Sequence, residues 1–402
     1  MKTLRVALST SVVQRGKSGV ASYLFGLLEG LRAIDAPVEM TLLGLEEDRG
    51  LFEPWLDWCR WEPVPEKWRP AVRNVFWHQT RLRAVLKRLG ADVLHIPSYR
   101  RIVWKAPTPQ VVTVHDCAAF AVRGKYDAAR MFYGTQVVTR LARQVERLIA
   151  VSHATADDMK RYFKIPLSEI CVIWNGIDHE TFQPREEAGA VLAKRQGQWE
   201  PYFLYLARLE HPGKNHVRLI ESFERFVTEN PGRPDHLVLG GADWHGADVI
   251  HARIAASPCR ERIRTLGFVE KADLPLWYSA ATAMIYPSLF EGFGLPPIEA
   301  MACGTPVICS SRGSLGEVVE DAARIIEPED IDDMAAAMRE MTPQTRSRWR
   351  QAGLQRSRQF DWKKAAIAMY EVYRSAAVLP NSLSSPERLV NRADRSGPGG
   401  FP

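Results

Sequence analysis

Residues 287–311 read PSLFEGFGLPPIEAMACGTPVICSS, and this stretch is the most informative in the sequence. The apolar run Ala283–Tyr286 before it predicts a strand, which leads into a loop with two glycines, Gly292 and Gly294. Because proline is tolerated in a first helical turn, the pair Pro296–Pro297 predicts that a helix begins there. A glycine loop that leads into a helix N-terminus offers free N–H groups and a favourable dipole to an anion. The stretch therefore predicts an anion site in an α/β sheet.

Two carboxylates lie in this stretch, eight residues apart. Glu291 belongs to the glycine loop, and Glu299 is placed in the first turn of the predicted helix. A carboxylate beside a phosphate site is explained if it accepts hydrogen bonds from the hydroxyls of a ribose or a hexose. The alternative is an ordinary turn followed by a carboxylate that the helix N-terminus favours.

Strand-like and helix-like segments alternate outward from this stretch along most of the chain. Short runs rich in Val, Ile and Leu, without clean alternation, suit parallel strands that are buried on both faces. These runs are LRVALS, VEMTLLGL, DVLHIP, QVVTVHD and RLIAVS in the first half, and YFLYLA, HLVLGG, IRTLGF, AMIYPS, TPVICS and ARIIEP from Tyr202 onward. With amphipathic stretches between the runs, 402 residues predict two doubly wound α/β domains.

The boundary between the two domains is expected after the turn dipeptide Asn175-Gly176, within the loose stretch 179–198. A helical pattern at Trp362–Ala377 closes the globular part. The tail at 380–402 is dense in Ser, Pro and Gly, so we expect it to be disordered.

Composition excludes several classes of protein. With 46% apolar and 25% charged residues, the chain is neither fibrous nor wholly disordered. No apolar run approaches the ~20 residues of a membrane span, and the first residues lack a secretory h-region. The 6 cysteines form no C-x-x-C and no zinc spacing, so we expect a cytosolic protein with reduced, mostly buried thiols.

Positive charge is concentrated in the first domain. Residues 60–105 contain 11 Lys and Arg against 3 Asp and Glu, and an amphipathic helix is predicted over Ala71–Leu89. A basic, Trp-rich, amphipathic segment is typical of an interfacial membrane helix. The alternatives are an ordinary surface helix with solvated charges, or a nucleic-acid site, for which no motif is present. The tryptophans of the segment 51–89 are Trp55, Trp58, Trp61, Trp68 and Trp77.

Two cations follow the first strand of the second domain. Arg208 and Lys214 are six residues apart in a loop that contains Pro212 and Gly213, so they can converge on one diphosphate. Arg offers a fork of donors to two phosphate oxygens, whereas Lys offers a point charge. The alternative is a solvated basic turn.

The first domain offers two smaller signals. His115 closes the run VVTVHD, at the carboxyl edge where open parallel sheets bind ligands, and the alternative is a structural histidine. Gly19 lies in the loop after the first strand and permits close approach of a ligand. Neither G-x-G-x-x-G nor a Walker A motif is present.

Asp330-Ile331-Asp332 has the D-x-D pattern that can hold a divalent cation. It opens the helix-like run IDDMAAAMREM, and acidic residues are favoured at a helix N-terminus. We therefore interpret it as a helix start and expect no metal site.

Four features together resemble the retaining family 4 glycosyltransferases of GT-B architecture. They are the pair Glu291 and Glu299 within EGFGLPPIEAMACGTPVI, the loop of Arg208 and Lys214, NGID at 175–178, and VTVHD. The resemblance implies an α/β GT-B fold, with two Rossmann-like doubly wound domains and the active site in the interdomain cleft. The implied parts are an acceptor-binding domain at 1–180, a nucleotide-sugar-binding domain at 195–362, and a helix at 363–379 that returns to the first domain.

The resemblance also implies roles for individual residues. Arg208 and Lys214 hold the donor diphosphate, and no metal or other cofactor is expected to help them neutralise the leaving group. Glu299 binds the nucleotide ribose, and Glu291 binds hydroxyls of the donor sugar. The remaining contacts are implied for His115, which faces the reacting sugar, for Gly19, which follows Ser18 where the family often has a second glycine, and for the backbone of Phe293, Gly294 and Leu295.

HIPSY and the context of NGID are most similar to bacterial mannosyl- and rhamnosyltransferases of polysaccharide assembly. We therefore expect a retaining hexosyltransferase that moves mannosyl from GDP-mannose to a saccharide acceptor, itself lipid-linked, in cell-surface polysaccharide biosynthesis. No side chain at 267–271 decides between guanine and uracil. The alternatives are a sugar phosphorylase or epimerase of the same architecture, and a non-catalytic nucleotide-sugar-binding subunit of an assembly complex.

The expected location is the cytoplasm, peripheral on the inner face of the cytoplasmic membrane. The expected partners are the nucleotide-diphosphate sugar, the saccharide or lipid-linked acceptor and an anionic membrane surface, with no nucleic acid.

Overall fold

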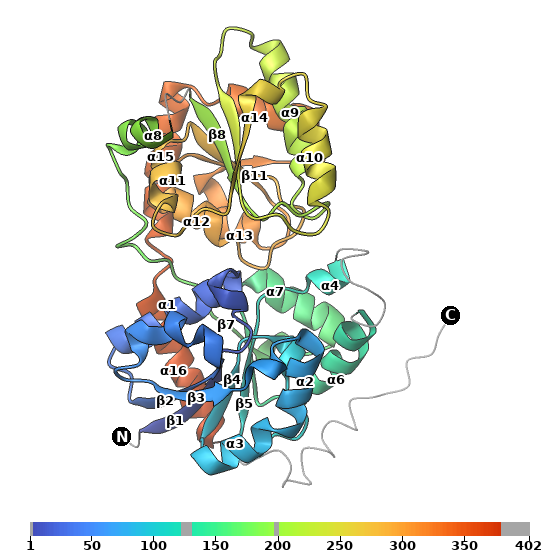
Figure 1. The fold of residues 1–402 in the computed structure, drawn as a ribbon, viewed down its shortest axis with the longest axis vertical. Coiled ribbons are helices and arrows are strands. Elements are labelled where there is room, and N and C mark those ends of the chain that lie inside the picture. Colours follow the sequence, from blue (N-terminus) through green and yellow to red (C-terminus); the bar gives the residue numbers. More distant parts are fainter. Residues whose placement is uncertain (1–2, 122–130, 197–200, 379–402) are drawn as a thin grey trace.

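The computed structural model describes residues 3–121, 131–196 and 201–378. These residues form two parallel β-sheets, each with helices on both faces, in two units that lie end to end (Figure 1). The prediction of two doubly wound α/β domains is confirmed. The tail at 380–402 lies outside the described residues.

The first sheet has seven strands in the order β3-β2-β1-β4-β5-β6-β7, and every adjacent pair is parallel. The strands are β1 (Leu4–Ser9), β2 (Val38–Leu45), β3 (Arg60–Val64), β4 (Val93–Ile96), β5 (Gln110–Val114), β6 (Arg147–Ala150) and β7 (Ile170–Val172). The runs predicted as strands correspond to β1, β2, β4, β5 and β6.

The apolar pattern does not predict β3 and β7, the two edge strands. β3 reads RWEPV and contains Pro63, which an edge strand tolerates because one of its sides needs no hydrogen-bond partner. β7 has only 3 residues, too few to form a recognisable apolar run.

The second sheet has six strands in the order β10-β9-β8-β11-β12-β13, again parallel throughout. All of them coincide with predicted runs. The strands are β8 (Tyr202–Leu206), β9 (His236–Gly240), β10 (Ile263–Gly267), β11 (Ala283–Tyr286), β12 (Val307–Ser310) and β13 (Arg324–Ile326). The strand order reverses between β8 and β11, and open α/β sheets bind ligands beyond the carboxyl ends of strands at such a point.

Helices connect the strands in both units (Figure 1). Those of the first half are α1 (Gly19–Ala33), α2 (Ala71–Thr80), α3 (Leu82–Leu89), α4 (Ala118–Ala121), α6 (Val138–Ala142) and α7 (His153–Asp158). Those of the second half are α8 (Ala188–Gln196), α9 (His216–Glu229), α10 (Ala247–Ala255), α11 (Leu274–Ala280), α12 (Leu295–Ala302), α13 (Leu315–Val319), α14 (Ile331–Arg339), α15 (Pro343–Ser357) and α16 (Trp362–Val378).

The terminal helix α16 packs in the core of the first domain, against α1 (Figure 1). Two glycines of α1 permit this close approach. A Cβ at Gly26 would lie 1.9 Å from the ring of Trp362, and one at Gly30 would lie 2.3 Å from its carbonyl oxygen. Further along α16, the buried Tyr373 hydroxyl hydrogen-bonds Nδ1 of His95 on β4 at 2.8 Å.

The stretch 179–198 is expected from the sequence to be a loose linker, but its described part, 179–196, packs on the second domain. It contains α8, which contacts α11. Phe182 and Leu192 are buried in the core of the second domain together with Ile177. The second domain therefore gathers residues N-terminal to the predicted start at 195, because their apolar side chains complete its core.

The basic, Trp-rich segment 51–89 differs from its prediction in two ways. The single helix predicted over Ala71–Leu89 is divided into α2 and α3 at Arg81. Trp55 and Trp77 are buried, and the other three tryptophans of the segment are half-buried. These tryptophans therefore mainly pack within the fold.

The thiols agree with the prediction. All six cysteines are free, and Cys59, Cys117, Cys303 and Cys309 are buried. In the part of the chain that the structure describes, no helix combines the length and the apolar character that crossing a bilayer would require.

Candidate active site

The glycine loop leads into α12 as predicted. α12 begins at Leu295 with prolines in its first turn, and Gly294 caps it at φ 93°. A Cβ at Gly294 would lie 2.5 Å from the Leu315 side chain, so only glycine fits there. Glu299 is the fifth residue of α12, just beyond the first turn in which the sequence predicts it. Because prolines have no N–H, the first turn offers fewer backbone donors to an anion than the prediction assumed.

The carbonyl groups of this loop are held from both domains. Ser314 donates to the Glu291 carbonyl from its backbone N–H at 3.0 Å and from its hydroxyl at 3.1 Å. The Gly292 carbonyl accepts hydrogen bonds from the first domain, from Ser152 Oγ at 2.8 Å and Thr155 Oγ1 at 3.1 Å. A Cβ at Gly292 would lie 1.7 Å from the His115 carbonyl oxygen. The loop therefore meets the carboxyl end of β5 across the domain boundary.

Lys214 and Glu291 form an ion pair at the point where the strand order of the second sheet reverses. Lys214 Nζ lies 2.5 Å from Glu291 Oε1, and both side chains are about 15% exposed. The Tyr286 hydroxyl donates to the same Oε1 at 3.0 Å. Among the described residues, no hydrogen bond reaches Oε2 of this carboxylate, so it stays available to a ligand.

Arg208 has a different carboxylate partner. Its guanidinium donates to Glu210 Oε2 at 3.1 Å and lies over the ring of Trp244, 4.7 Å from the centroid. The Arg208 side chain is 41% exposed. The two predicted diphosphate ligands thus lie on one loop, each with its own partner, and the structure records no contact between them.

Glu299 lies beside the residues that follow β10. The Tyr278 hydroxyl donates to its Oε2 at 3.0 Å. Burial raises the pKa of Glu299 to about 7, and the hydrogen bond from Tyr278 and the charge of Lys271 oppose that rise. Lys271 Nζ pairs with Asp178 of the NGID sequence at 2.9 Å. Glu299, the residue predicted to bind the ribose, therefore has a pKa near neutral pH.

His115 is half-buried at the end of β5, and its Nε2 is buried without a hydrogen-bond partner. Burial lowers its pKa to about 4, against the charge of Asp116 and a backbone hydrogen bond with Pro97, so the ring is neutral at pH 7. The ring of Tyr23 meets it edge-on at 4.7 Å. A buried nitrogen without a hydrogen-bond partner is unusual, and a hydrogen bond to a bound ligand would explain it.

Gly19 is the first residue of α1 and is exposed. Ser18 caps the helix by accepting a hydrogen bond from Ala21 N at 3.2 Å. A Cβ at Gly19 would meet no atom within 4 Å, so the fold itself does not require glycine there. The approach of a ligand to Gly19 stays a prediction.

Family models match both halves of the chain. Residues 17–181 match the model described as Glycosyltransferase Family 4, and residues 192–356 match the model described as Glycosyl transferases group 1. The chain is 31% identical over 270 residues to O-antigen chain mannosyltransferase B of Escherichia coli, across 66% of this chain and 70% of that relative. The chain belongs to the glycosyltransferase family that these two models describe.

A second relative and two solved structures add to the comparison, and the structures show the fold. The glycosyltransferase is 29% identical over 265 residues to MMP alpha-(1->4)-mannosyltransferase of Mycolicibacterium hassiacum, across 61% of this chain and 58% of that relative. Its fold matches sucrose-phosphate synthase from Thermosynechococcus elongatus, with a TM-score of 0.74, 20% identity and coverage of 92% and 98% of the two chains. It also matches Anabaena HepE in complex with UDP-glucose, with a TM-score of 0.74, 18% identity and coverage of 92% and 100%. The predicted GT-B fold is confirmed.

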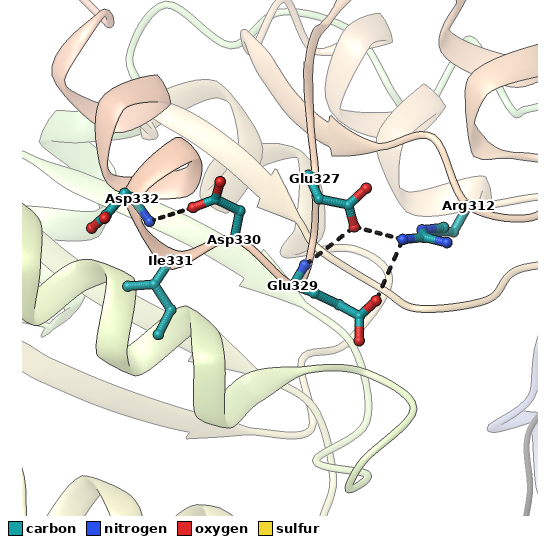
Figure 2. A pocket seen from close by; sticks show the side chains of 6 residues that line it. All are labelled: Arg312, Glu327, Glu329, Asp330, Ile331 and Asp332. Carbon is teal, nitrogen blue, oxygen red and sulfur yellow. Dashed lines mark hydrogen bonds and ion pairs between the residues drawn. The ribbon is translucent and has the colours of Figure 1, made fainter.

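Figure 2 shows a pocket of this glycosyltransferase that none of the predicted site residues lines. Arg312 pairs with Glu327 inside it, at 2.6 Å. Asp330 caps α14 by accepting a hydrogen bond from Asp332 N at 2.9 Å, which confirms the interpretation of D-x-D as a helix start. Within residues 3–121, 131–196 and 201–378, no group of three or more His, Cys, Asp or Glu side chains could hold a metal ion. The pocket is lined by Arg312, Glu327, Glu329, Asp330, Ile331 and Asp332.

The pKa of Glu299 makes the predicted ribose contact pH-dependent. Ribose hydroxyls donate to the ionised carboxylate, and a group of pKa about 7 is mostly protonated at pH 6 and mostly ionised at pH 8. A nucleotide sugar should therefore bind about tenfold more weakly at pH 6 than at pH 8. Calorimetric titration at both pH values measures this ratio.

Glu299→Gln is the control for that titration, because the amide does not titrate. We expect its donor affinity to vary little over the same range, and an equal pH dependence in the variant would exclude Glu299 as the cause. The stability of the fold depends on pH in the opposite direction from donor binding. The raised pKa stabilises the ligand-free fold below the pKa of the unfolded state, about 4.3, and this contribution is lost as the pH rises through about 7.

Three aromatic residues of the site were not predicted. Tyr286 and Tyr278 position the two glutamates, and Trp244 covers Arg208. Both tyrosines belong to apolar runs and read as core residues, which they also are. The only signal of Trp244 is its place in the loop after β9, at the carboxyl edge of the sheet.

Proposed function

We propose that this glycosyltransferase moves mannosyl from GDP-mannose to a saccharide acceptor carried on a lipid, with retention of anomeric configuration, in cell-surface polysaccharide biosynthesis. The observation that carries the proposal is the Lys214–Glu291 ion pair at the reversal point of the second sheet, next to the loop that meets His115. Two of the relatives are named as mannosyltransferases, which supports the sugar. The structure of HepE with UDP-glucose supports a nucleotide sugar as donor.

The cations would act on the leaving group. As the bond between the anomeric carbon and the diphosphate breaks, the electron pair goes to the phosphate oxygen. Lys214 has two N–H groups beyond the one that Glu291 engages, and Arg208 offers its fork. Preorganised charge at the point where charge develops is usually the largest single catalytic contribution.

The remaining site residues would hold the sugar. Glu291 accepts a hydrogen bond from a sugar hydroxyl on its free Oε2, while Lys214 and Tyr286 fix its Oε1. The neutral ring of His115 contacts the reacting sugar through Nε2. The acceptor hydroxyl attacks the face from which the diphosphate departs and passes its proton to the departing oxygen, so the configuration is retained.

A panel of GDP-, UDP- and dTDP-sugars tests this function. A ligand present at 100 times its Kd stabilises a protein by about 2.7 kcal/mol, so a thermal shift identifies the donor. The protein with that donor is then incubated with saccharide and lipid-linked acceptors, and products are identified by mass spectrometry. We expect the GDP-mannose arm to give a product heavier than the acceptor by one hexosyl residue, a hexose less one water. Sugar release or isomerisation without any transfer would favour a phosphorylase or an epimerase.

We also propose that transfer needs no metal ion, because two side-chain cations would neutralise the diphosphate. Excess EDTA should therefore leave the initial rate within about twofold of the untreated rate, with a known metal-dependent glycosyltransferase as the control. Loss of activity that manganese restores would show that a metal takes part.

We propose that the first domain binds an anionic membrane surface. Fewer exposed residues support this proposal than the sequence indicated. Val72 and Phe76 of α2 are 78% and 57% exposed, and Trp104 is 52% exposed. Gln79 of α2 accepts a hydrogen bond from the Trp104 backbone at 3.0 Å, so Trp104 lies beside the same helix. Basic residues follow on α3, although Arg88 is paired with Glu62 at 2.6 Å. Apolar groups flanked by cations favour an anionic bilayer.

Vesicle sedimentation tests that surface. The protein should bind anionic vesicles but not neutral ones, and binding should weaken as salt shortens the Debye length below about 10 Å. Replacing the four cations of this surface by Gln should abolish binding, while donor hydrolysis in solution survives, because the nucleotide site is in the other domain. Unchanged binding by the quadruple variant would contradict the proposal. The four cations are Arg81, Arg83, Lys87 and Arg88.

A further inference from the structure

Glu317 on α13 of the second domain is bonded to the first domain. Its Oε1 accepts hydrogen bonds from His153 N at 2.9 Å and from Trp174 Nε1 at 2.7 Å, and its Oε2 accepts one from Ala154 N at 3.0 Å. Both oxygens of one half-buried carboxylate are thus used across the domain boundary. Hydrogen bonds to a carboxylate are stronger than those between neutral groups, and Glu317 accepts three of them.

Four consecutive residues of the first domain, 152–155, hold both Glu317 and the glycine loop. The backbone N–H groups of His153 and Ala154 bind Glu317, and the hydroxyls of Ser152 and Thr155 on either side bind the Gly292 carbonyl. The start of α7 therefore contacts α13 and the loop at once. Any shift of this segment relative to α13 also moves the partners of Gly292.

α13 is itself fixed within the second domain by Arg356 of α15. The guanidinium of Arg356, which is 4% exposed, donates to the carbonyl oxygens of Val318 at 2.9 Å and Glu317 at 2.7 Å. Its plane lies near the rings of Trp174 and Phe360, at 5.3 Å and 5.1 Å from their centroids. The backbone of Glu317 is thus held within the second domain, so its side chain can fix the position of the first domain.

We infer that Glu317 is a positioning residue for sugar transfer. It fixes the start of α7 against α13, which keeps the Gly292 loop in contact with the carboxyl end of β5 and sets His115 relative to the donor sugar. The inference rests on the proposed site in that it takes His115 and the glycine loop as the place of reaction. Glu317 is not expected to hold the nucleotide, because its carboxylate is already bonded to His153, Ala154 and Trp174.

Glu317→Gln tests the inference, since the amide keeps the size of the side chain but presents an NH2 group to backbone N–H donors. We expect kcat for transfer to fall 10- to 100-fold, while the Kd of the nucleotide sugar stays within twofold. Glu320→Gln is the matched control. Glu320 pairs with the same Arg356 at 2.9 Å but does not reach the first domain, so its variant should keep the wild-type kcat. A kcat of Glu317→Gln within twofold of wild type would overturn the inference.

A double-mutant cycle examines the link to the glycine loop. Ser152→Ala with Thr155→Val removes the hydroxyls that bind Gly292, and its effect on kcat should be non-additive with that of Glu317→Gln because both act through one segment. Additive effects would show that the two contacts act independently, which contradicts the inference.

Amide hydrogen exchange gives a readout that does not need turnover. In Glu317→Gln the amides of His153 and Ala154 should lose protection together with those of Phe293 and Leu295, whereas the helix amides of α15 keep theirs. Unchanged exchange at 293–295 would overturn the positioning role even if no donor gave transfer. Absence of transfer in the wild type, by contrast, would refute the proposed function alone.

Discussion

Lys214→Ala should lower kcat/KM for transfer by ~10²–10³-fold, the effect expected when a donor to a developing negative charge is lost. Lys214 Nζ lies 2.5 Å from Glu291 Oε1, so the substitution also leaves the carboxylate without its cation. We expect most of the loss in kcat, because the charge on the diphosphate grows as the bond breaks. Steady-state kinetics with the donor varied at saturating acceptor separates kcat from KM.

Arg225→Ala is the control for this variant. Arg225 lies on α9 in the same domain, is 53% exposed and pairs with Glu229, so its removal should leave the kinetics unchanged. Far-ultraviolet circular dichroism and a melting curve establish that Lys214→Ala is folded. Transfer by folded Lys214→Ala within threefold of the wild-type rate would remove Lys214 from the site.

Gly292→Ala should lower kcat by ~10²-fold or more, since displacement of reacting groups by about 1 Å can cost that much. The new Cβ would lie 1.7 Å from the His115 carbonyl oxygen, a backbone atom that no side-chain rotation can move away, so the two domains must separate locally. The nucleotide should still bind, because its predicted contacts are in the second domain.

Calorimetry with the donor nucleotide and transfer kinetics on the same preparation measure these two effects. Gly232→Ala is the matched control, since a Cβ there would meet no atom within 4 Å. Wild-type transfer by Gly292→Ala would show that the approach of the loop to β5 is not needed for the reaction.

The sequence predicts the strands of both sheets well because each central strand is a local run of apolar residues. It predicts the Glu291 and Glu299 pair and the Arg208–Lys214 loop because these residues are few, spaced by glycine and proline, and placed after strands. The edge strand β3 is not predicted, because its charged residues and its proline are typical of a loop.

Features that depend on contacts between distant segments are not predicted. Trp55 stacks on Phe25 of α1 at 5.4 Å, a contact that the composition of 51–89 does not reveal, so its tryptophans read as a membrane surface. α8 reads as a linker because its apolar side chains face α11, some 80 residues further along the chain. Glu317 reads as an ordinary helix carboxylate, since its partners lie more than 140 residues away.

The anomeric configuration of the product tests the central claim most directly. The claim is that the donor is held by Lys214, Arg208 and Glu291 and that the acceptor attacks the face from which the diphosphate leaves. The product of the donor selected by the thermal-shift panel is purified, and NMR of its new anomeric centre is compared with that of the donor. The account predicts an α-linked product from an α-linked nucleotide sugar. A β-linked product would contradict it.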